Sequence, residues 1–387
     1  MSAVLSPDLR FERDAAPATA RRGVGLLGCG VVGSAVARRL LAAHPGLIRA
    51  IAVKDPSKLR DVAWSDWTAD PFAVVDDPAI GVIVECIGGV RLARELVLRA
   101  IAHGKDVVTA NKEMIALEGP WLQAFAARTG ATLHYEAAVG GAIPVLRVLD
   151  SSLADEEVLE VGGVVNGTTN FVLSQMESGA PYAEALAEAQ RLGFAEADPR
   201  NDVEGHDAGH KLSILATLAF RRPVAFASIG RTGIVGVRPD DMRLAAERGW
   251  RLKLIALARR TADGLEAGVT PAFVPRDHPF ARPSGAENVV RLVGAGAGPL
   301  EFFGLGAGGS ATASSVVGDI VAAVDARDRG GSVRRVRIGD PLPVVPLRVP
   351  LVVRSATGVT VTGPLPLESA GVIALRNNAD SVIPLLS

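Results

Sequence analysis

A glycine-rich segment near the start of the chain constrains its fold more than any other feature. The apolar run GVGLLG is typical of a buried strand, and Gly28, Gly30 and Gly33 have the spacing G-x-G-x-x-G. The helical pattern VVGSAVARRLLAAH overlaps this motif, so the glycines stand between a strand and a helix, as a dinucleotide-binding turn requires. Gly28 permits the tight turn, Gly30 lets the backbone approach a pyrophosphate, and Gly33 allows close helix packing. The first helical turn, with Val31 and Val32, then offers free N–H groups to phosphate.

The rest of the N-terminal third repeats this alternation. Apolar runs LIRAIAV, GVIVECIGG and KDVVTA are joined by segments that include the helical pattern RLARELVLRAIAHG. Strands that alternate with helices form right-handed crossovers and a parallel sheet. We therefore predict a Rossmann-like, doubly wound α/β domain. A Gly-rich turn in some other doubly wound sheet is the alternative explanation of the motif.

The end of the second predicted strand bears on the choice of dinucleotide. Asp55 follows the glycines by about 20 residues, where an acid binds the ribose diol of NAD. Lys54, Lys58 and Arg60 favour a 2′-phosphate, so we predict NADP, with NAD possible and a solvated loop as the alternative. The ends of the later strands add further predicted cofactor contacts, namely Cys86, Ile87, Gly88, Thr109 and Lys112.

The two cysteines, Cys29 and Cys86, each end a predicted strand. In the usual strand order these two strands are neighbours, which brings the thiols close together beside the cofactor. We interpret both as small buried residues. The alternative hypothesis is that oxidation links them and blocks cofactor binding.

Composition excludes several classes of protein. With 48% hydrophobic residues and a formal net charge of −1, the chain lacks the basic excess of a nucleic-acid-binding protein. No apolar run approaches the roughly 18 residues that span a bilayer. Residues 1–21 lack the apolar core of a signal peptide and are predicted to be a flexible tail. Two cysteines suit a reducing compartment, so we predict a cytoplasmic protein.

The acidic segment RLGFAEADPRNDVEGHDAGHK holds the most distinctive chemistry of the second half. Its Asp207 and Lys211 lie four residues apart, so on a helix they occupy one face. The apolar run LSILATLAF that follows predicts a buried helix, which would draw this pair toward the interior. A lysine held near carboxylates can exchange protons. A surface ion pair is the simpler interpretation of the spacing alone.

Other segments of the second half contain candidate ligand groups. Lys112 follows a predicted strand at the sheet edge where ligands bind, or else begins a helix in solvent. The segment around Gly141 is a hinge, or a loop whose carbonyl oxygens suit a monovalent cation. Asn166 to Asn170 form a turn that opens a helix, whose N–H groups can bind a carboxylate. The glycines around Gly306 precede another helical run.

Two stretches give weaker signals. Residues 223–300 are expected to mix short strands and turns, in an order that the pattern does not determine. Residues after Arg329 are rich in Pro and Val, with little helical periodicity. We expect them to form strands that complete the second domain or serve a subunit contact.

Taken together, these segments resemble homoserine dehydrogenases. The resemblance runs from about residue 23 to residue 325 and includes, in family order, GLLGCGVVG, VVTANK, YEAAVGGAIPVL, GVVNGTTNFVLSQM, GFAEADPRNDVEGHDAGHK and GLGAGGSATASSVVGD. It implies the reversible reduction of L-aspartate 4-semialdehyde to L-homoserine with NADPH or NADH, on the route to threonine and methionine. It also implies a homodimer formed through the second domain.

The resemblance assigns roles to matching positions. Lys211 matches the family's proton donor and acceptor, Asp207 the acid beside it, and Lys112 a lysine near both substrate and nicotinamide. Gly306 is expected to contact the cofactor. The expected substrate-binding residues are Glu196, which would meet the substrate's amino group, Asp202, Gly167 and Thr168. The backbone carbonyls that match a sodium-type site belong to Glu136, Val139, Gly141 and Ile143.

The resemblance also implies domain boundaries. We expect a flexible tail at 1–21, a dinucleotide-binding domain at 22–138 with 309–330, and an α+β substrate-binding and dimerisation domain at 139–308. The C-terminal extension, 331–387, is too short for the regulatory ACT domain of many relatives and lacks its alternating strands and helices.

Two other functions fit parts of the pattern. The first is another NAD(P)-dependent amino-acid dehydrogenase of similar plan, and the second is a non-catalytic nucleotide-sensing protein with the same fold. The acidic segment favours homoserine over other substrates. A sensor has no use for a proton-exchanging lysine.

Overall fold

The computed structural model describes residues 23–329 and 338–386, which divide into two compact units. Within these residues, unit 1 comprises 23–109, 121–134 and 317–329, and unit 2 comprises 110–120, 135–316 and 338–386. Two of the boundaries, at 120/121 and 316/317, fall inside helices α4 (Lys112–Thr129) and α11 (Gly309–Asp328). The predicted N-terminal tail lies outside the described residues.

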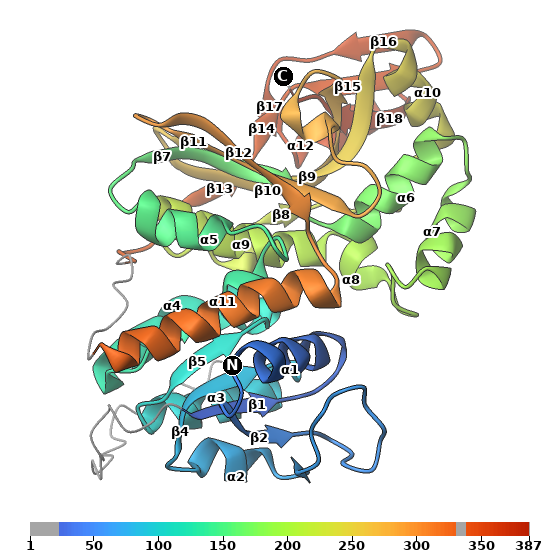
Figure 1. The fold of residues 1–387 in the computed structure, drawn as a ribbon. Coiled ribbons are helices and arrows are strands. Elements are labelled where there is room, and N and C mark those ends of the chain that lie inside the picture. Colours follow the sequence, from blue (N-terminus) through green and yellow to red (C-terminus); the bar gives the residue numbers. More distant parts are fainter. Residues whose placement is uncertain (1–22, 330–337, 387) are drawn as a thin grey trace. The chain divides into compact units, whose positions relative to one another are not determined.

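Unit 1 contains a parallel sheet whose six described strands follow the order β3-β2-β1-β4-β5-β6. This is the strand order of dinucleotide-binding domains, so the predicted doubly wound α/β fold is confirmed. The strands are β1 (Gly23–Leu27), β2 (Ile48–Ala52), β3 (Trp67–Thr68), β4 (Ile80–Glu85), β5 (Asp106–Thr109) and β6 (Leu133–His134). Helices α1 (Val31–Ala43), α2 (Pro71–Asp76) and α3 (Arg91–Ala102) lie between these strands (Figure 1), and α4 lies between β5 and β6 in the sequence.

The core of unit 1 explains why its strands appear in the sequence as continuous apolar runs. Strands β1, β4 and β5 are buried at every position, as expected for parallel strands covered on both faces. The strand order reverses between β1 and β4, and ligands of such sheets bind beyond the carboxyl ends of the strands at this point. The glycine motif and Cys86 follow these two strands directly.

Unit 2 is built on a mixed sheet whose seven described strands follow the order β12-β11-β7-β9-β10-β13, with β8 paired to β10. Strands β9 (Trp250–Thr261) and β10 (Gly264–Pro275) form a long antiparallel hairpin. The other strands are β7 (Val158–Val164), β8 (Gly230–Arg231), β11 (Glu287–Gly294), β12 (Gly298–Leu305) and β13 (Val344–Pro346).

The expectation of only short strands and turns between residues 223 and 300 is wrong. Strands β9 and β10 each have 12 residues, and helix α10 (Pro239–Glu247) precedes them. Charged residues inside β9 and Pro271 inside β10 interrupt the apolar pattern. Proline usually indicates an edge strand or no strand, and among the described residues Pro271 pairs only with Leu254 of β9, in a part of β10 that neither β8 nor β13 reaches.

Helix α9 (His206–Phe220) packs on the sheet of unit 2. Every residue from Asp207 to Phe220 is buried, so this is a core helix and not an amphipathic surface helix. It therefore carries its own charged residues into the interior. The remaining helices before residue 221 are α5 (Val145–Arg147), α6 (Gly167–Glu177), α7 (Tyr182–Arg191) and α8 (Arg200–Val203).

The C-terminal segment covers part of the same sheet. Strand β13 pairs with β10, and Leu347, Val349 and Leu351 share an apolar core with residues of β9 and β10. The segment contains β14 (Arg348–Val349), β15 (Leu351–Ser355), β16 (Gly358–Val361), β17 (Leu365–Pro366), α12 (Ser369–Arg376) and β18 (Ala379–Pro384). The expectation of little helical structure after Arg329 is corrected by helix α12. Its eight residues are too few for a periodic pattern to be seen.

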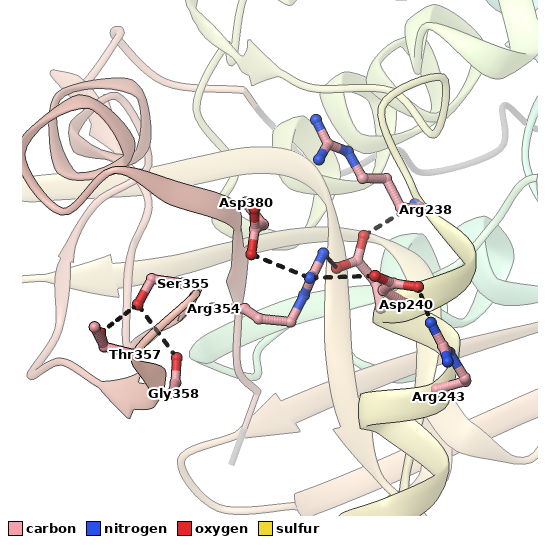
Figure 2. Close-up of polar contacts among 9 residues, drawn as sticks. Arg238, Asp240, Arg243, Arg354, Ser355, Thr357, Gly358 and Asp380 are labelled. Atoms are coloured by element: carbon pink, nitrogen blue, oxygen red, sulfur yellow. Dashed lines mark hydrogen bonds and ion pairs between the residues drawn. The ribbon is translucent and has the colours of Figure 1, made fainter.

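An arginine joins the C-terminal strands to helix α10. The Arg354 guanidinium on β15 lies 3.4 Å from both Asp240 and Asp241 and 3.5 Å from Asp380 (Figure 2). Asp241 also accepts a hydrogen bond from the Arg238 backbone N–H at the start of α10. One guanidinium thus bridges three carboxylates from two parts of unit 2, which fixes the C-terminal segment against α10.

Candidate functional site

Three charged side chains meet at the start of helices α4 and α9. Asp207 Oδ2 lies 2.7 Å from Lys211 Nζ, and Asp207 Oδ1 lies 2.9 Å from Lys112 Nζ. Lys211 Nζ also donates a 2.6 Å hydrogen bond to the carbonyl of Val165, at the end of β7. An ammonium has three N–H donors, so Lys211 retains one for a ligand.

The interpretation of Asp207 and Lys211 as a surface ion pair is wrong. Their exposed fractions are 3% and 8%, because α9 is buried on all sides. Burial alone would raise the pKa of Asp207, but the ammonium groups of Lys211 and Lys112 hold it well below its ordinary value. In turn, Asp207 raises the pKa of Lys112. The carboxylate is therefore ionised at neutral pH and orients two cations.

Asn166 is a site residue for which the sequence indicated only a helix cap. Its Nδ2 donates to Asp202 Oδ1 at 2.6 Å and to Asp207 Oδ2 at 2.8 Å. Its Oδ1 accepts from the Thr169 N–H at 2.8 Å and so caps α6. Burial and the neighbouring Asp207 raise the pKa of Asp202. One amide therefore links the start of α6 to two acids that are far away in the sequence.

The predicted substrate-binding residues differ in how closely they are associated with this cluster. Gly167 and Thr168 form the first turn of α6, and the Thr168 hydroxyl donates to the Phe194 carbonyl at 2.6 Å. Glu196 is exposed on the loop after α7. Its charge still contributes to the raised pKa of Lys112, so it lies within electrostatic reach of that amine. The structure thus brings Lys112, Asp202, Asp207 and Lys211 together, with Glu196 at the margin.

In unit 1 the glycine motif has the geometry of a phosphate-binding turn. Gly28 has φ +92°, a conformation that favours glycine. A Cβ at Gly33 would lie 2.1 Å from the Gly28 carbonyl oxygen, whereas one at Gly30 would meet nothing within 4 Å. Gly33 is thus needed for packing and Gly30 leaves open space. Helix α1 has no side-chain cap, and Val31 is exposed, so the N–H groups of its first turn suit a pyrophosphate.

A buried acid, Glu85, shapes the loop after β4 and was not predicted. Its Oε1 accepts from the N–H groups of Ile87 and Gly88 at 2.9 and 3.1 Å, and its Oε2 accepts from the Thr109 hydroxyl at 2.5 Å. Three of the predicted cofactor residues therefore bond to Glu85. Ile87 and Gly88 do so through their N–H groups, and Thr109 does so through its hydroxyl. A single acid within an apolar run gives little indication of its role. The groups that Glu85 bonds follow β4 and end β5, and only the folded sheet brings them together.

The loop after β2 holds the residues predicted to select the dinucleotide. Asp55 Oδ1 accepts from the Ser57 N–H at 2.9 Å and hydroxyl at 2.6 Å, and these bonds lower the pKa of Asp55. The Arg60 guanidinium lies over the ring of Trp67 and donates to the Asp55 carbonyl. Lys54 is exposed directly after the strand. The loop therefore presents cations together with an acid that is already hydrogen-bonded.

Cys29 and Cys86 are free thiols at the ends of the neighbouring strands β1 and β4. Burial raises the pKa of the Cys86 thiol well above its ordinary range. A thiolate is the species that reacts with oxidants, so this environment disfavours the hypothetical disulfide.

The four carbonyl groups proposed for a cation belong to residues that pack tightly. The Gly141 carbonyl accepts from the Ser315 hydroxyl at 2.6 Å, and the Ile143 carbonyl from the Val145 N–H at 2.9 Å. The Glu136 carbonyl accepts a 3.4 Å bond from the Val139 N–H. Each carbonyl oxygen has a second lone pair. Among the described residues no group of three or more His, Cys, Asp or Glu could hold a metal ion.

Gly306, which the resemblance assigns to the cofactor, lies in the loop between β12 and α11. A Cβ at Gly306 would lie 2.0 Å from the Asn288 amide, and one at Gly141 would lie 2.7 Å from the Gly306 backbone. The amide of Asn288 is buried, and within residues 23–329 and 338–386 neither of its polar atoms has a hydrogen-bond partner. The loop therefore requires glycine at this position, and it covers an amide able to bind a polar ligand.

Comparison with known proteins agrees with this geometry. The family model "Homoserine dehydrogenase" matches residues 144–321, and "Homoserine dehydrogenase, NAD binding domain" matches residues 28–136. The chain is 42% identical to homoserine dehydrogenase of Corynebacterium glutamicum over 325 residues, which are 80% of this chain and 73% of the relative. It is 45% identical to that of Mycobacterium leprae over 322 residues, 79% and 73% of the two chains.

Solved structures give the same result. A homoserine dehydrogenase from Thiobacillus denitrificans superposes with a TM-score of 0.87 at 34% identity, over 94% of this chain and 98% of that one. A hyperthermophilic archaeal homoserine dehydrogenase in complex with NADPH gives 0.69 at 25% identity, over 82% and 100%. In residues 23–329 and 338–386, no helix is long and apolar enough to cross a membrane. The resemblance seen in the sequence is thus confirmed, and the chain belongs to the homoserine dehydrogenase family.

Proposed function

We propose that the protein interconverts L-aspartate 4-semialdehyde and L-homoserine with NADPH or NADH, and that Lys211 exchanges the proton of the substrate hydroxyl. The observation that supports this role most directly is a buried amine, held by Asp207 and Val165, with one N–H donor left for a ligand. A group that exchanges a proton must lie within hydrogen-bond reach of the reacting oxygen. The nicotinamide, when bound, supplies or accepts the hydride.

The residues around Lys211 divide the remaining tasks. In the direction of reduction, the Lys211 ammonium polarises the aldehyde oxygen and then donates its proton. Asp207 stays ionised, because the two lysines lower its pKa, and so it keeps both amines in place. Lys112, which is partly exposed, adds positive charge where an alkoxide would develop.

Substrate recognition is assigned to the acids and to the first turn of α6. Homoserine carries an ammonium and a carboxylate. Glu196 and Asp202 suit the ammonium, and the N–H groups at Gly167 and Thr168 suit the carboxylate. Asp202 is positioned by the Asn166 amide, which also bonds Asp207. The proton-exchange and recognition groups are thereby connected.

Replacing Glu196 by glutamine is expected to raise the KM for homoserine about tenfold and to change kcat little, because the substrate ammonium loses an opposite charge in both ground and transition states. Initial rates at varied homoserine measure both constants. Glu204→Gln is the matched control, since Glu204 lies in the same acidic segment and pairs with His206. If the two variants show the same KM, Glu196 does not meet the ammonium.

The cofactor is proposed to be NADP, bound with its 2′-phosphate at the loop after β2. Lys54 and Lys58 are exposed there, and Asp55 is already bonded to Ser57. Lys54→Ala is then expected to raise the KM for NADP about tenfold, the loss of roughly 1.5 kcal/mol for one hydrogen bond to a charged group. The KM for NAD should not change. Initial rates of homoserine oxidation with each cofactor test this, and equal changes with both would contradict it.

The proposal extends to a monovalent cation, probed as sodium, at the carbonyls of Glu136, Val139, Gly141 and Ile143. It also includes a homodimer formed through unit 2, location in the cytoplasm, and the division into domains at 22–138 with 309–330 and at 139–308. Initial rates of homoserine oxidation with NAD and NADP, with and without sodium or potassium, test the activity, cofactor and cation together. Absence of turnover with either cofactor would contradict the proposed function.

A further inference from the structure

We propose that Lys253, on strand β9, is a positioning residue for substrate binding. It acts through Asn170 and the segment 283–287 on the first turn of α6. This inference rests on the proposed function, because it takes Gly167 and Thr168 as the residues that meet the substrate. No feature of the sequence marked Lys253 or Asn170 in this way.

Lys253 is almost completely enclosed. It is 1% exposed, and its Nζ donates to Asn170 Oδ1 and to the Pro283 carbonyl, both at 2.7 Å. Neither acceptor is charged, and no ion pair of Lys253 occurs among the described residues. A buried ammonium without a counter-charge is costly, so this lysine is poorly explained as a simple stabilising contact.

The protonation state of Lys253 does not alter these bonds. Burial, and then the nearby Arg251, lower the pKa of Lys253 to about 8, against the opposing effects of Glu177 and Glu287. An ammonium has three N–H donors and a neutral amine has two. Either form therefore satisfies both acceptors, and the geometry is kept through the neutral pH range.

The lysine determines which way the Asn170 amide faces. In its ammonium form Lys253 can only donate, so Asn170 turns its Oδ1 toward Nζ. Its Nδ2 then donates to the carbonyls of Gly285 and Glu287, at 2.9 and 3.3 Å. Asn170 is 0% exposed, so these bonds are shielded from bulk solvent. The segment 283–287 is thereby tied to α6 from within the core.

This segment packs directly against the proposed substrate-binding turn. A Cβ added at Gly167 would lie 2.9 Å from the carbonyl oxygen of Ala286, so the backbones of the two segments are in close contact. A shift of 283–287 must displace the start of α6. Asn166, which bonds Asp202 and Asp207, caps that same turn. The position of the substrate-binding N–H groups thus depends on Lys253.

The test replaces Lys253 by methionine, which has similar length and no donor. We expect the KM for homoserine to rise about tenfold, since displaced binding groups lose affinity steeply, while kcat changes less than about threefold and the KM for NADP stays the same. Asn170→Asp is the second variant. It still accepts from Lys253 but cannot donate to Gly285 and Glu287, and we expect the same rise. Because the two residues act in series, the double variant should resemble either single one.

Lys105→Met is the matched control. Lys105 is also 1% exposed and donates to a backbone carbonyl, that of Asp77 in unit 1. Thermal unfolding of each variant reports the structural cost, and Lys105→Met should lose stability with no change in the KM for homoserine. If Lys253→Met and Asn170→Asp fold and keep the wild-type KM, the inference is wrong while the proposed function stands. A wild-type protein without homoserine turnover would instead overturn the proposed function itself.

Discussion

Replacing Lys211 by alanine is expected to lower kcat for homoserine oxidation by about 100- to 10,000-fold, the range that general acid–base catalysis contributes. The hydroxyl proton would have no acceptor within reach as the hydride leaves. The KM for NADP should remain near its wild-type value, because the glycine motif that we propose to bind the phosphates belongs to unit 1. Steady-state kinetics at saturating homoserine measure the loss, and a fluorescence titration with NADPH measures cofactor binding.

Lys211→Arg separates charge from proton exchange. A guanidinium keeps the positive charge beside Asp207 but does not release a proton at accessible pH. If Lys211 exchanges the proton, arginine should restore little of the activity lost in Lys211→Ala. Recovery of near-normal turnover with arginine, or near-normal turnover of the alanine variant, would show that the amine only supports the structure.

Replacing Asp207 by asparagine is expected to remove about 3 kcal/mol from the free energy of unfolding at pH 7, since breaking a buried ion pair leaves uncompensated charge. Lys211 and Lys112 would then face each other without the carboxylate that lies between them. Activity should fall as well, because both amines lose their orientation. Urea unfolding monitored by circular dichroism gives the stability, with Asp198→Asn as the control, since Asp198 pairs with Arg200 in solvent.

The contribution of Asp207 to the free energy of unfolding depends on pH, and its pKa determines the direction of this dependence. Its pKa in the folded protein lies below its ordinary value, so the unfolded chain binds this proton more readily. The carboxylate therefore contributes its full stability above about pH 4, and that contribution is lost as the pH falls through the folded pKa. The difference in unfolding free energy between wild type and Asp207→Asn should shrink below pH 4. A difference independent of pH would contradict the assignment.

Much of the dinucleotide-binding unit was predictable from local pattern. Strands β1, β4 and β5 are continuous apolar runs, because parallel strands with both faces covered contain few polar residues. The glycines of the motif all act within one turn, so their spacing alone predicts the conformation of that turn. Strands β9 and β10 were missed for the opposite reason. The two strands pair with each other as a hairpin, and charged residues of β9 bond to groups distant in the sequence, such as Asn170 for Lys253.

The candidate site was predictable in part. Asp207 and Lys211 share a helix face, and four-residue spacing is enough to pair them. Their burial was misjudged by spacing alone, because exposure is a property of what packs around α9. The sequence did not identify Asn166, Glu85 or Lys253 as site residues. Each of them forms a side-chain hydrogen bond with a residue that lies 24 to 83 positions away in the sequence.

The amino-acid sequence by itself determined the nucleotide-binding turn, the α/β alternation, the pairing of Asp207 with Lys211 and membership of the family. These depend on spacing within one turn or helix, or on several motifs in order. Only the tertiary structure decided that the ion pair is buried, that Lys112 also contacts the Asp207 carboxylate, and that Lys253 bonds Asn170 of helix α6. Such contacts bring together residues from separate elements, and short-range periodicity contains no information about which distant segments will meet in the core.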